Sequence, residues 1–130
     1  MSVSSSCKAK ILVVEDDSFM QTILSMFLDK RFETDIAENG IEAVLLLQNS
    51  VLPSLIISDL NTPEMNGLEL IKYLKANDHL KAIPIIILCG DDNPQQRQNC
   101  LQAGAVAFIV KPFNPVELGA LIDKILQPLT

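Results

Sequence analysis

The chain has 130 residues with a formal net charge of −6, and 48% of its residues are hydrophobic, which favours one compact globular domain over disorder. Its apolar runs are too short to cross a bilayer, so no membrane partner is expected. The ten Lys and Arg residues are scattered along an acidic chain, which argues against direct binding of nucleic acid.

The first nine residues lack the apolar core of a signal peptide, and we predict that 1–9 is a flexible lead-in to a single domain over 10–130. The three cysteines form no Cys-x-x-Cys pair, which fits neither a disulfide framework nor a thiolate zinc site. Reduced thiols and the missing signal peptide together predict a cytoplasmic location.

Strand and helix patterns alternate through the first half of the chain. A β-branched apolar run over 10–15 predicts a strand that stops at three acids, Glu15, Asp16 and Asp17. Helical spacing follows from Ser18 to about Arg31, with either Asp17 or Ser18 placed to cap the helix. The main apolar stripe of that helix is predicted at Phe19, Ile23, Met26 and Phe27, widened by Met20, Leu24 and Leu28. A weaker edge strand over 33–37, a helix over 41–48 and a strand over 54–58 complete this half.

The second half continues the alternation. A helix is predicted from 67 to about 77, and the very apolar run over 84–88 predicts a central strand. The next helix, over 94–103, is polar and should pack weakly before it closes at Gly104. A strand over 106–110 follows, and Asn114 with Pro115 begins a last helix that runs to about 126.

Five strands alternating with five helices predict an α/β fold, a doubly wound five-stranded parallel sheet with helices on both faces. We adopt the strand order 2-1-3-4-5 from flavodoxin-like folds in general, since the pattern alone does not derive it. This order places a crevice beyond the carboxyl ends of the first and third strands, where ligands of such sheets bind.

Three carboxylates should meet in this crevice. The buried run over 55–58 ends at Asp59, and Glu15 and Asp16 follow the first strand. Clustered carboxylates repel one another unless a cation lies among them, and an open oxygen site beside a phosphoryl group suits Mg²⁺. The alternative is that Glu15, Asp16 and Asp17 only cap the following helix, which could hold for Asp17 alone.

Lys111 follows the last predicted strand at the same edge of the sheet as these acids. Its aliphatic stem can lie along apolar surface while its ammonium group reaches the carboxylates. A lysine before a proline can also be an ordinary surface residue, but the acids across the crevice favour a functional one.

From Lys10 to about Gln127 the chain resembles the receiver domain of two-component response regulators, including those of chemotaxis. The resemblance is carried, in order and at family spacing, by the segments 11–16, 37–43, 59–70 and 104–113, including Asp59-x-Asn-x-Pro and Phe108-Ile-Val-Lys-Pro. It implies that Asp59 accepts a phosphoryl group from the phosphohistidine of a sensor histidine kinase or a histidine phosphotransfer protein. It further implies that Asp16, Asp59 and the backbone carbonyl of Asn61 hold Mg²⁺, with Glu15 acting through water.

The same resemblance implies that Lys111 contacts the phosphoryl oxygens and that the Lys111–Pro112 peptide bond is cis. Phe108 occupies the family's aromatic switch position, where an inward or outward side chain reports the state of the domain. Cys89 stands where receivers usually carry Thr or Ser to hydrogen-bond the phosphoryl group. Because a thiol is a weak donor, acceptance at Asp59 is expected to persist while the switch is impaired.

Other functions stay open at this point. A pseudo-receiver would bind partners through the same fold and switch poorly because of Cys89. A Mg²⁺-dependent phosphohydrolase would need a substrate-recognition cap that 130 residues do not provide, and a flavin carrier would need phosphate-binding groups in the crevice where this chain has acids.

A receiver would catalyse its own phosphorylation and dephosphorylation without being a conventional turnover enzyme. The phosphoryl donor must come from another protein, since the single histidine, His79, is expected in a solvent-exposed loop. We expect a monomer, either a stand-alone regulator or a part of a larger protein, because the chain shows no effector domain and few charges around its fourth helix.

Overall fold

The computed structural model describes residues 8–49 and 51–126. Its elements are β1 (Lys10–Val14), α1 (Ser18–Leu28), β2 (Glu33–Ala37), α2 (Gly40–Asn49), β3 (Leu55–Asp59), α3 (Gly67–Lys75), β4 (Ile85–Cys89), α4 (Pro94–Ala103), β5 (Ala107–Val110) and α5 (Pro115–Leu126). Each predicted strand and helix is present, with bounds that differ from the prediction by a few residues at most.

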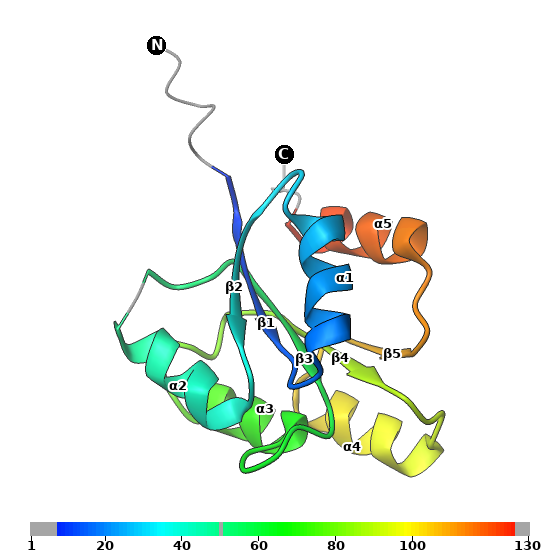
Figure 1. The fold of residues 1–130 in the computed structure, drawn as a ribbon. Coiled ribbons are helices and arrows are strands. Elements are labelled where there is room, and N and C mark those ends of the chain that lie inside the picture. The colour runs from blue at the N-terminus through cyan, green and yellow to red at the C-terminus, as the bar shows by residue number, and fades with distance from the viewer. Residues whose placement is uncertain (1–7, 50, 127–130) are drawn as a thin grey trace.

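The five strands form one parallel sheet in the order β2-β1-β3-β4-β5, which confirms the predicted fold (Figure 1). The central strands β3 and β4 are buried along their whole length, as expected for strands covered on both faces. Parallel strands present their carboxyl ends at one edge, so β1, β3 and β4 end close together there.

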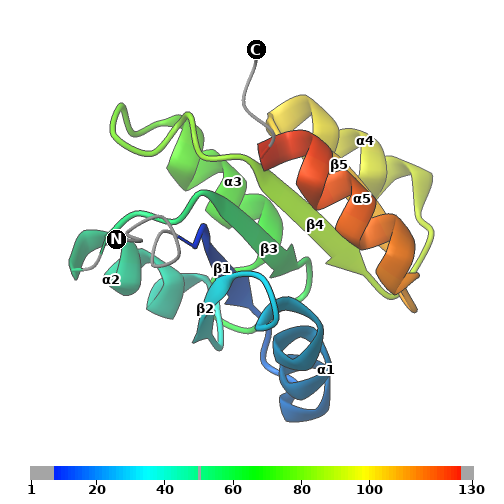
Figure 2. The ribbon, with the colours of Figure 1, turned by 90° about the horizontal axis from the view of Figure 1, so that it is seen from above.

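Two layers of helices cover the sheet (Figure 2). One core joins alternate strand residues to α2, α3 and α4, and includes Ile87, Leu70 and Cys100. The other core lies between the sheet and the pair α1 and α5, and includes Leu24 and Ile122. Neighbouring residues of each strand thus enter opposite cores, as the two-residue period of a strand requires.

The predicted apolar stripe of α1 is wrong in part. Phe19 and Met26 are each 68% exposed, and the fully buried residues of the helix are Leu24 and Leu28. Met20 and Phe27 pack beside them against the second core. Apolar residues lie nearly all round this helix, so the spacing could not show which side faces the sheet. Asp17 is the N-cap, because its Oδ2 accepts a hydrogen bond from the backbone N–H of Met20 at 2.9 Å.

The two helices beside the carboxyl edge of β4 differ in how they are held. α3 begins with a capping box between Asn66 and Glu69 and buries Gly67, Leu70, Ile71 and Leu74. α4 begins at the N-cap Asn93 but buries only Cys100, which confirms the predicted weak packing of this helix. Gly104 ends α4 at a φ of 126°, a conformation that favours glycine.

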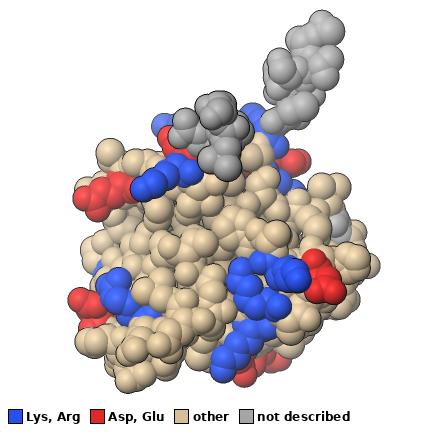
Figure 3. Space-filling model, turned by 180° about the vertical axis from the view of Figure 1, so that it is seen from behind, with Lys and Arg blue, Asp and Glu red and all other residues tan. Residues whose placement is uncertain are grey.

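The predicted lead-in over 1–9 falls mostly outside the described part of the chain, since the description begins at residue 8. Every helix within the described ranges is too short or too polar to cross a membrane. On the face seen in Figure 3, Lys and Arg side chains stand in separate groups, several of them beside acidic side chains.

Candidate functional site

Three carboxylates from two neighbouring strands meet at the carboxyl edge of the sheet. Glu15 and Asp16 follow β1, and Asp59 is the last residue of β3. One carboxylate oxygen of each lies within 4.8 Å of the others. Glu15 and Asp59 are buried, with 2% and 7% of their surface exposed, whereas Asp16 is exposed to solvent. The predicted convergence of the three acids is therefore confirmed.

Lys111 approaches the same carboxylates from the far side of β4. Its Nζ lies 2.9 Å from Asp59 Oδ1 and 3.6 Å from Glu15 Oε1. Burial lowers the pKa of Lys111, but the hydrogen bond and the charge of Asp59, together with Glu15, outweigh burial and raise it, so the side chain is a cation. The Lys111–Pro112 peptide bond is cis, as predicted.

The surroundings of Glu15 disfavour the charged form of its carboxyl group. Desolvation by burial raises the pKa of this carboxyl group above its ordinary value, and repulsion by Asp59 raises it further, against the lowering effect of Lys111. Its Oε2 accepts a hydrogen bond from the backbone N–H of Asp17 at 3.3 Å, while the buried Oε1 has no hydrogen-bond partner. An added positive charge would stabilise this arrangement.

The acids fit a hard divalent cation. All three offer carboxylate oxygens, the ligand type that Mg²⁺ prefers, and the exposure of Asp16 leaves one side open to water or a phosphoryl group. Glu15 Oε1 points to the same conclusion, since this buried oxygen accepts no hydrogen bond and Lys111 Nζ stays 3.6 Å away from it. Asn61, predicted to offer its backbone carbonyl, lies two residues beyond Asp59 in the loop that begins at Leu60.

This loop between β3 and α3 is fixed at both ends by close backbone contacts. A Cβ on Gly67 would lie 2.9 Å from the backbone oxygen of Asp59, so α3 can start this near the acceptor strand only with glycine there. Gly40 makes a similar approach at the start of α2, where its N–H donates to Met65 O at 2.9 Å and a Cβ would lie 2.6 Å from that oxygen. Glu64, which precedes Met65 in this loop, adopts a positive φ of 70°.

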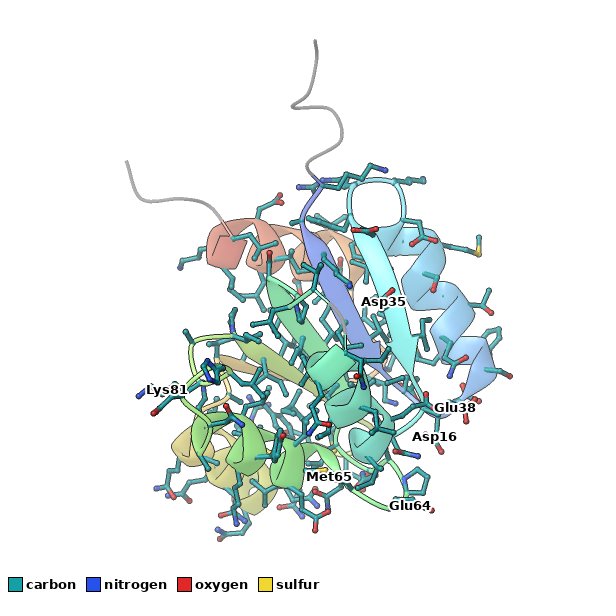
Figure 4. All side chains as sticks on the ribbon, turned by 90° about the vertical axis from the view of Figure 1, so that its left-hand side faces the viewer. Asp16, Asp35, Glu38, Glu64, Met65 and Lys81 are labelled. Atoms are coloured by element: carbon teal, nitrogen blue, oxygen red, sulfur yellow. The ribbon has the colours of Figure 1, made fainter. Side chains whose placement is uncertain are left out.

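Asp16 lies at the same end of the molecule as Glu64 and Met65 of this loop, away from Lys81 (Figure 4). The loop is thus held by Gly40 of α2, the helix that precedes β3 in the chain. Sequence reasoning missed the role of Gly40 because its partner, Met65, is far along the chain, and a lone glycine after Asn39 indicates only a turn.

The two predicted switch residues lie next to α4. Cys89 is the last residue of β4, fully buried, and its Sγ lies 3.9 Å from Gln96 Oε1. Phe108, in β5, is 6% exposed, so its ring points inward. Arg97 covers that ring with its guanidinium carbon 5.0 Å from the ring centroid. Neither Gln96 nor Arg97 could be assigned these contacts from the sequence, because both stand in a polar helix without a periodic pattern.

Comparison with known proteins decides the family of this fold and site. The sequence model of the response regulator receiver domain matches residues 11–123. The chain belongs to the response regulator receiver domain family. It is 37% identical to the chemotaxis protein CheY1 of Helicobacter pylori over 119 residues, covering 90% of this chain and 96% of that protein.

Solved receiver structures share the fold. The chemotaxis response regulator CheY4 of Vibrio cholerae superposes with a TM-score of 0.84 at 33% identity, covering 92% of this chain and 100% of that one. The receiver domain of a sensor histidine kinase of Pseudomonas aeruginosa superposes with a TM-score of 0.85 at 27% identity, covering 94% of this chain and 100% of that one. That second structure has a magnesium ion coordinated in its active site cleft.

The receiver domain described here functions as a phosphoacceptor in two-component signalling, and a pseudo-receiver is not favoured. Receiver domains bind Mg²⁺ in the acidic pocket and interact with histidine kinases and phosphotransfer proteins. In this chain Glu15, Asp16 and Asp59 form an acidic cluster at the carboxyl edge of the sheet.

Proposed function

We propose that Asp59 is the residue of this receiver domain that takes the phosphoryl group from a partner's phosphohistidine. The observation that carries the proposal is the position of its carboxylate, nearly buried at the end of β3 and 2.9 Å from the ammonium group of Lys111. Asp16 is exposed to solvent and forms no ion pair with Lys111, and Glu15 is more deeply buried and lies farther from Lys111 Nζ, at 3.6 Å, so Asp59 is the acid best placed beside the cation.

In the transfer, an oxygen of Asp59 attacks the phosphorus atom, an O–P bond forms and the P–N bond to the donor imidazole breaks. The electron pair of the broken bond stays on the imidazole nitrogen. Lys111 offsets charge on the phosphoryl oxygens, and the rigid strand end keeps Asp59 in line with the leaving nitrogen. The donor supplies the histidine, since His79 of this chain is exposed and lies in the connection that precedes β4.

Asp16, Asp59 and the backbone carbonyl of Asn61 would hold Mg²⁺ in this proposal, with Glu15 acting through water. Bound there, Mg²⁺ would supply positive charge against the phosphoryl oxygens. Support comes from the oxygen donor set within 4.8 Å and from Glu15 Oε1, a buried oxygen that accepts no hydrogen bond.

Cys89 and Phe108 form the switch in this proposal. Cys89 follows Leu88, the β4 partner of Asp59, so it ends the strand that lies beside the acceptor. Phe108 would report the state of the site through the position of its ring. The weak donor strength of the Cys89 thiol predicts incomplete switching with nearly normal phosphorylation.

Intact-protein mass spectrometry after incubation with acetyl phosphate and Mg²⁺ tests the acceptor. The parent should gain the mass of one phosphoryl group, and Asp59→Asn should gain none. Asp17→Asn, which changes a neighbouring acid that serves as a helix cap, should still be phosphorylated. Phosphorylation of Asp59→Asn to the same extent as the parent would refute the assignment.

Titration with Mg²⁺ tests the metal ligands. Asp16 contributes a carboxylate oxygen from the exposed side of the cluster, so Asp16→Ala should weaken binding by about 10- to 100-fold and leave the fold intact. Isothermal calorimetry of the parent, Asp16→Ala and the cap variant Asp17→Asn makes the comparison. Equal affinity of the parent and Asp16→Ala would remove Asp16 from the ligand set.

The wider setting is part of the same proposal. We expect the phosphoryl donor to be a sensor histidine kinase or a histidine phosphotransfer protein, and the domain to extend over 10–130 with 1–9 as its lead-in. A cytoplasmic location and a monomeric state agree with transfer from such a donor to one exposed site. Light scattering of the phosphorylated and unphosphorylated protein would test the monomer.

A further inference from the structure

Arg97 of α4 makes three contacts that converge on Phe108 and on the loop after Cys89. Its guanidinium carbon lies 5.0 Å from the centroid of the Phe108 ring. Its Nη1 donates to the backbone oxygen of Phe108 at 3.3 Å, and its Nη2 lies 3.3 Å from Asp92 Oδ1. One side chain therefore joins β5, α4 and the loop between β4 and α4.

The loop between β4 and α4 has room to move. A Cβ built on Gly90 would meet no atom within 4 Å, so open space surrounds the residue that follows Cys89. Asp92 is two residues further on, with 69% of its side chain exposed. A shift of Cys89 would pass along this short segment to Asp92 and from there to Arg97.

Few other contacts hold this part of α4. Cys100 is the helix's only buried residue within the described chain, and it lies one turn beyond Arg97. Gln96, the neighbour of Arg97, reaches Cys89 with a weak thiol contact of 3.9 Å. Because the apolar packing of α4 is sparse here, the cation over the aromatic ring and the hydrogen bond to the Phe108 backbone oxygen contribute substantially to holding Phe108 against α4.

We propose that Arg97 is a positioning residue that holds Phe108 in its buried position and ties that position to the β4–α4 loop through Asp92. The coupling to phosphorylation rests on the function proposed for Asp59. The contact that holds Phe108 exists in the unphosphorylated domain and does not depend on that function. When the loop moves with Cys89, Asp92 displaces Nη2 of Arg97 and so changes the contact between the guanidinium group and the Phe108 ring. The position of Phe108 then follows the state of the site.

The same chain offers a matched control at the opposite end of the sheet. Arg31 also places its guanidinium carbon 5.0 Å from a phenylalanine centroid, that of Phe32, and pairs with the carboxylate of Asp123. These residues lie at the turn before β2 and on α5, far from the carboxyl edge that carries Asp59. Both arginines are similarly exposed, at 41% and 54% of the side chain.

Fluorine NMR with 4-fluorophenylalanine in the five phenylalanine positions reads both rings directly. Arg97→Met keeps much of the side-chain volume without the charge, and Arg97→Lys restores a cation without the fork of two donors. The Phe108 signal is assigned with a Phe108→Leu variant. In Arg97→Met this signal should shift toward the position of an exposed ring, which corresponds to about a fivefold fall in the ratio of buried to exposed Phe108. Arg97→Lys should recover part of that shift, and Arg31→Met should move the Phe32 signal only.

Asp92→Asn tests the tie to the loop. It should leave Phe108 nearly unchanged at rest but reduce the change in its signal when beryllofluoride, a phosphoryl mimic, and Mg²⁺ are added. An unchanged Phe108 signal in Arg97→Met would overturn the proposal that Arg97 holds Phe108 in its buried position. An equal shift of the Phe108 signal in Arg31→Met would overturn it too. A beryllofluoride response of Asp92→Asn equal to that of the parent would overturn the tie.

The mass assay separates this inference from the proposed acceptor. If Asp59 takes no phosphoryl group and Arg97→Met still shifts Phe108 at rest, the proposed function fails and the hold by Arg97 stands. If Asp59 is phosphorylated and the Phe108 signal does not change in Arg97→Met, the function stands and the inference fails.

Discussion

The helices α3 and α4 lie side by side on the same face of the sheet and border the same site, yet they are held by different kinds of contact. α3 buries Leu70, Ile71 and Leu74 and starts at a capping box formed by Asn66 and Glu69. α4 buries one small residue, Cys100.

We infer that this difference separates a fixed part of the site from a movable one. The segment between Asp59 and α3 must keep the acceptor in place, and its close approach at Gly67 and the buried face of α3 do so. The segment between Cys89 and α4 is held by polar contacts of Gln96 and Arg97, which are weaker singly and can be exchanged. Low local stability is what a region that changes position on signalling requires.

Truncation of a buried side chain gives the largest expected effect. Ile71 is fully buried in α3, so Ile71→Ala should lower the free energy of unfolding by about 2 to 5 kcal/mol. Leu101 of α4 is 42% exposed, and Leu101→Ala should cost less than about 0.5 kcal/mol. Urea denaturation of both variants checks the comparison, and similar losses would show that α4 is as firmly packed as α3.

A stronger donor at residue 89 should sharpen the comparison by tying α4 more closely to the phosphorylated site. Cys89→Thr replaces a weak thiol donor with a hydroxyl, and part of the ~1.5 to 3 kcal/mol of a hydrogen bond to a charged group becomes available. We expect the ratio of switched to unswitched Phe108 with beryllofluoride to rise up to about tenfold.

Fluorine NMR of the Phe108 ring in the parent and Cys89→Thr measures this ratio. Cys89→Ser is the control that adds a hydroxyl without the methyl group. Identical responses in all three would mean that the switch does not need a hydroxyl and that Cys89 acts as a small apolar residue in the core.

The smallest effect concerns the single buried residue of α4. Burial raises the pKa of the Cys100 thiol above its ordinary value of 9.0, with a further contribution from Cys89. The folded state thus favours the neutral thiol. Its contribution to stability is fully present below about pH 9.0 and is lost as the pH rises through the raised pKa.

Hydrogen exchange between pH 8 and pH 10 tests this, after correction for the intrinsic rate. Amides of α4 should lose protection at the alkaline end in the parent and not in Cys100→Ala, while α3 serves as the internal reference. Loss of protection in both helices together would locate the titrating group elsewhere.

The sequence predicted the strands, the parallel sheet and the meeting of Glu15, Asp16 and Asp59, because apolar runs that end on acids are local patterns. The weak packing of α4 was predictable for the same reason, since its shortage of apolar residues is visible in one segment. Strand order needed knowledge of similar folds.

The contacts that the sequence did not predict are those between distant segments. The buried side of α1 could not be chosen, because Phe19 and Met26 are as apolar as Leu24 and Leu28. The covering of Phe108 by Arg97 depends on how α4 lies against β5, and the approach of Gly40 to Met65 depends on how α2 meets the loop after β3. These relations are set by packing in three dimensions.

The order of the strands also governs when the site can exist during synthesis of the chain. In the sequence, Asp59 lies between Glu15, which follows β1, and Lys111, which follows β5. A nascent chain that has emerged only through β3 therefore carries three acids without the lysine that balances Asp59. Parallel sheets form slowly, since each pairing closes a long loop. We expect the carboxylate cluster to lack Lys111 until β5 pairs with β4. Nearly the whole domain must therefore leave the ribosome before Asp59 can act as the acceptor.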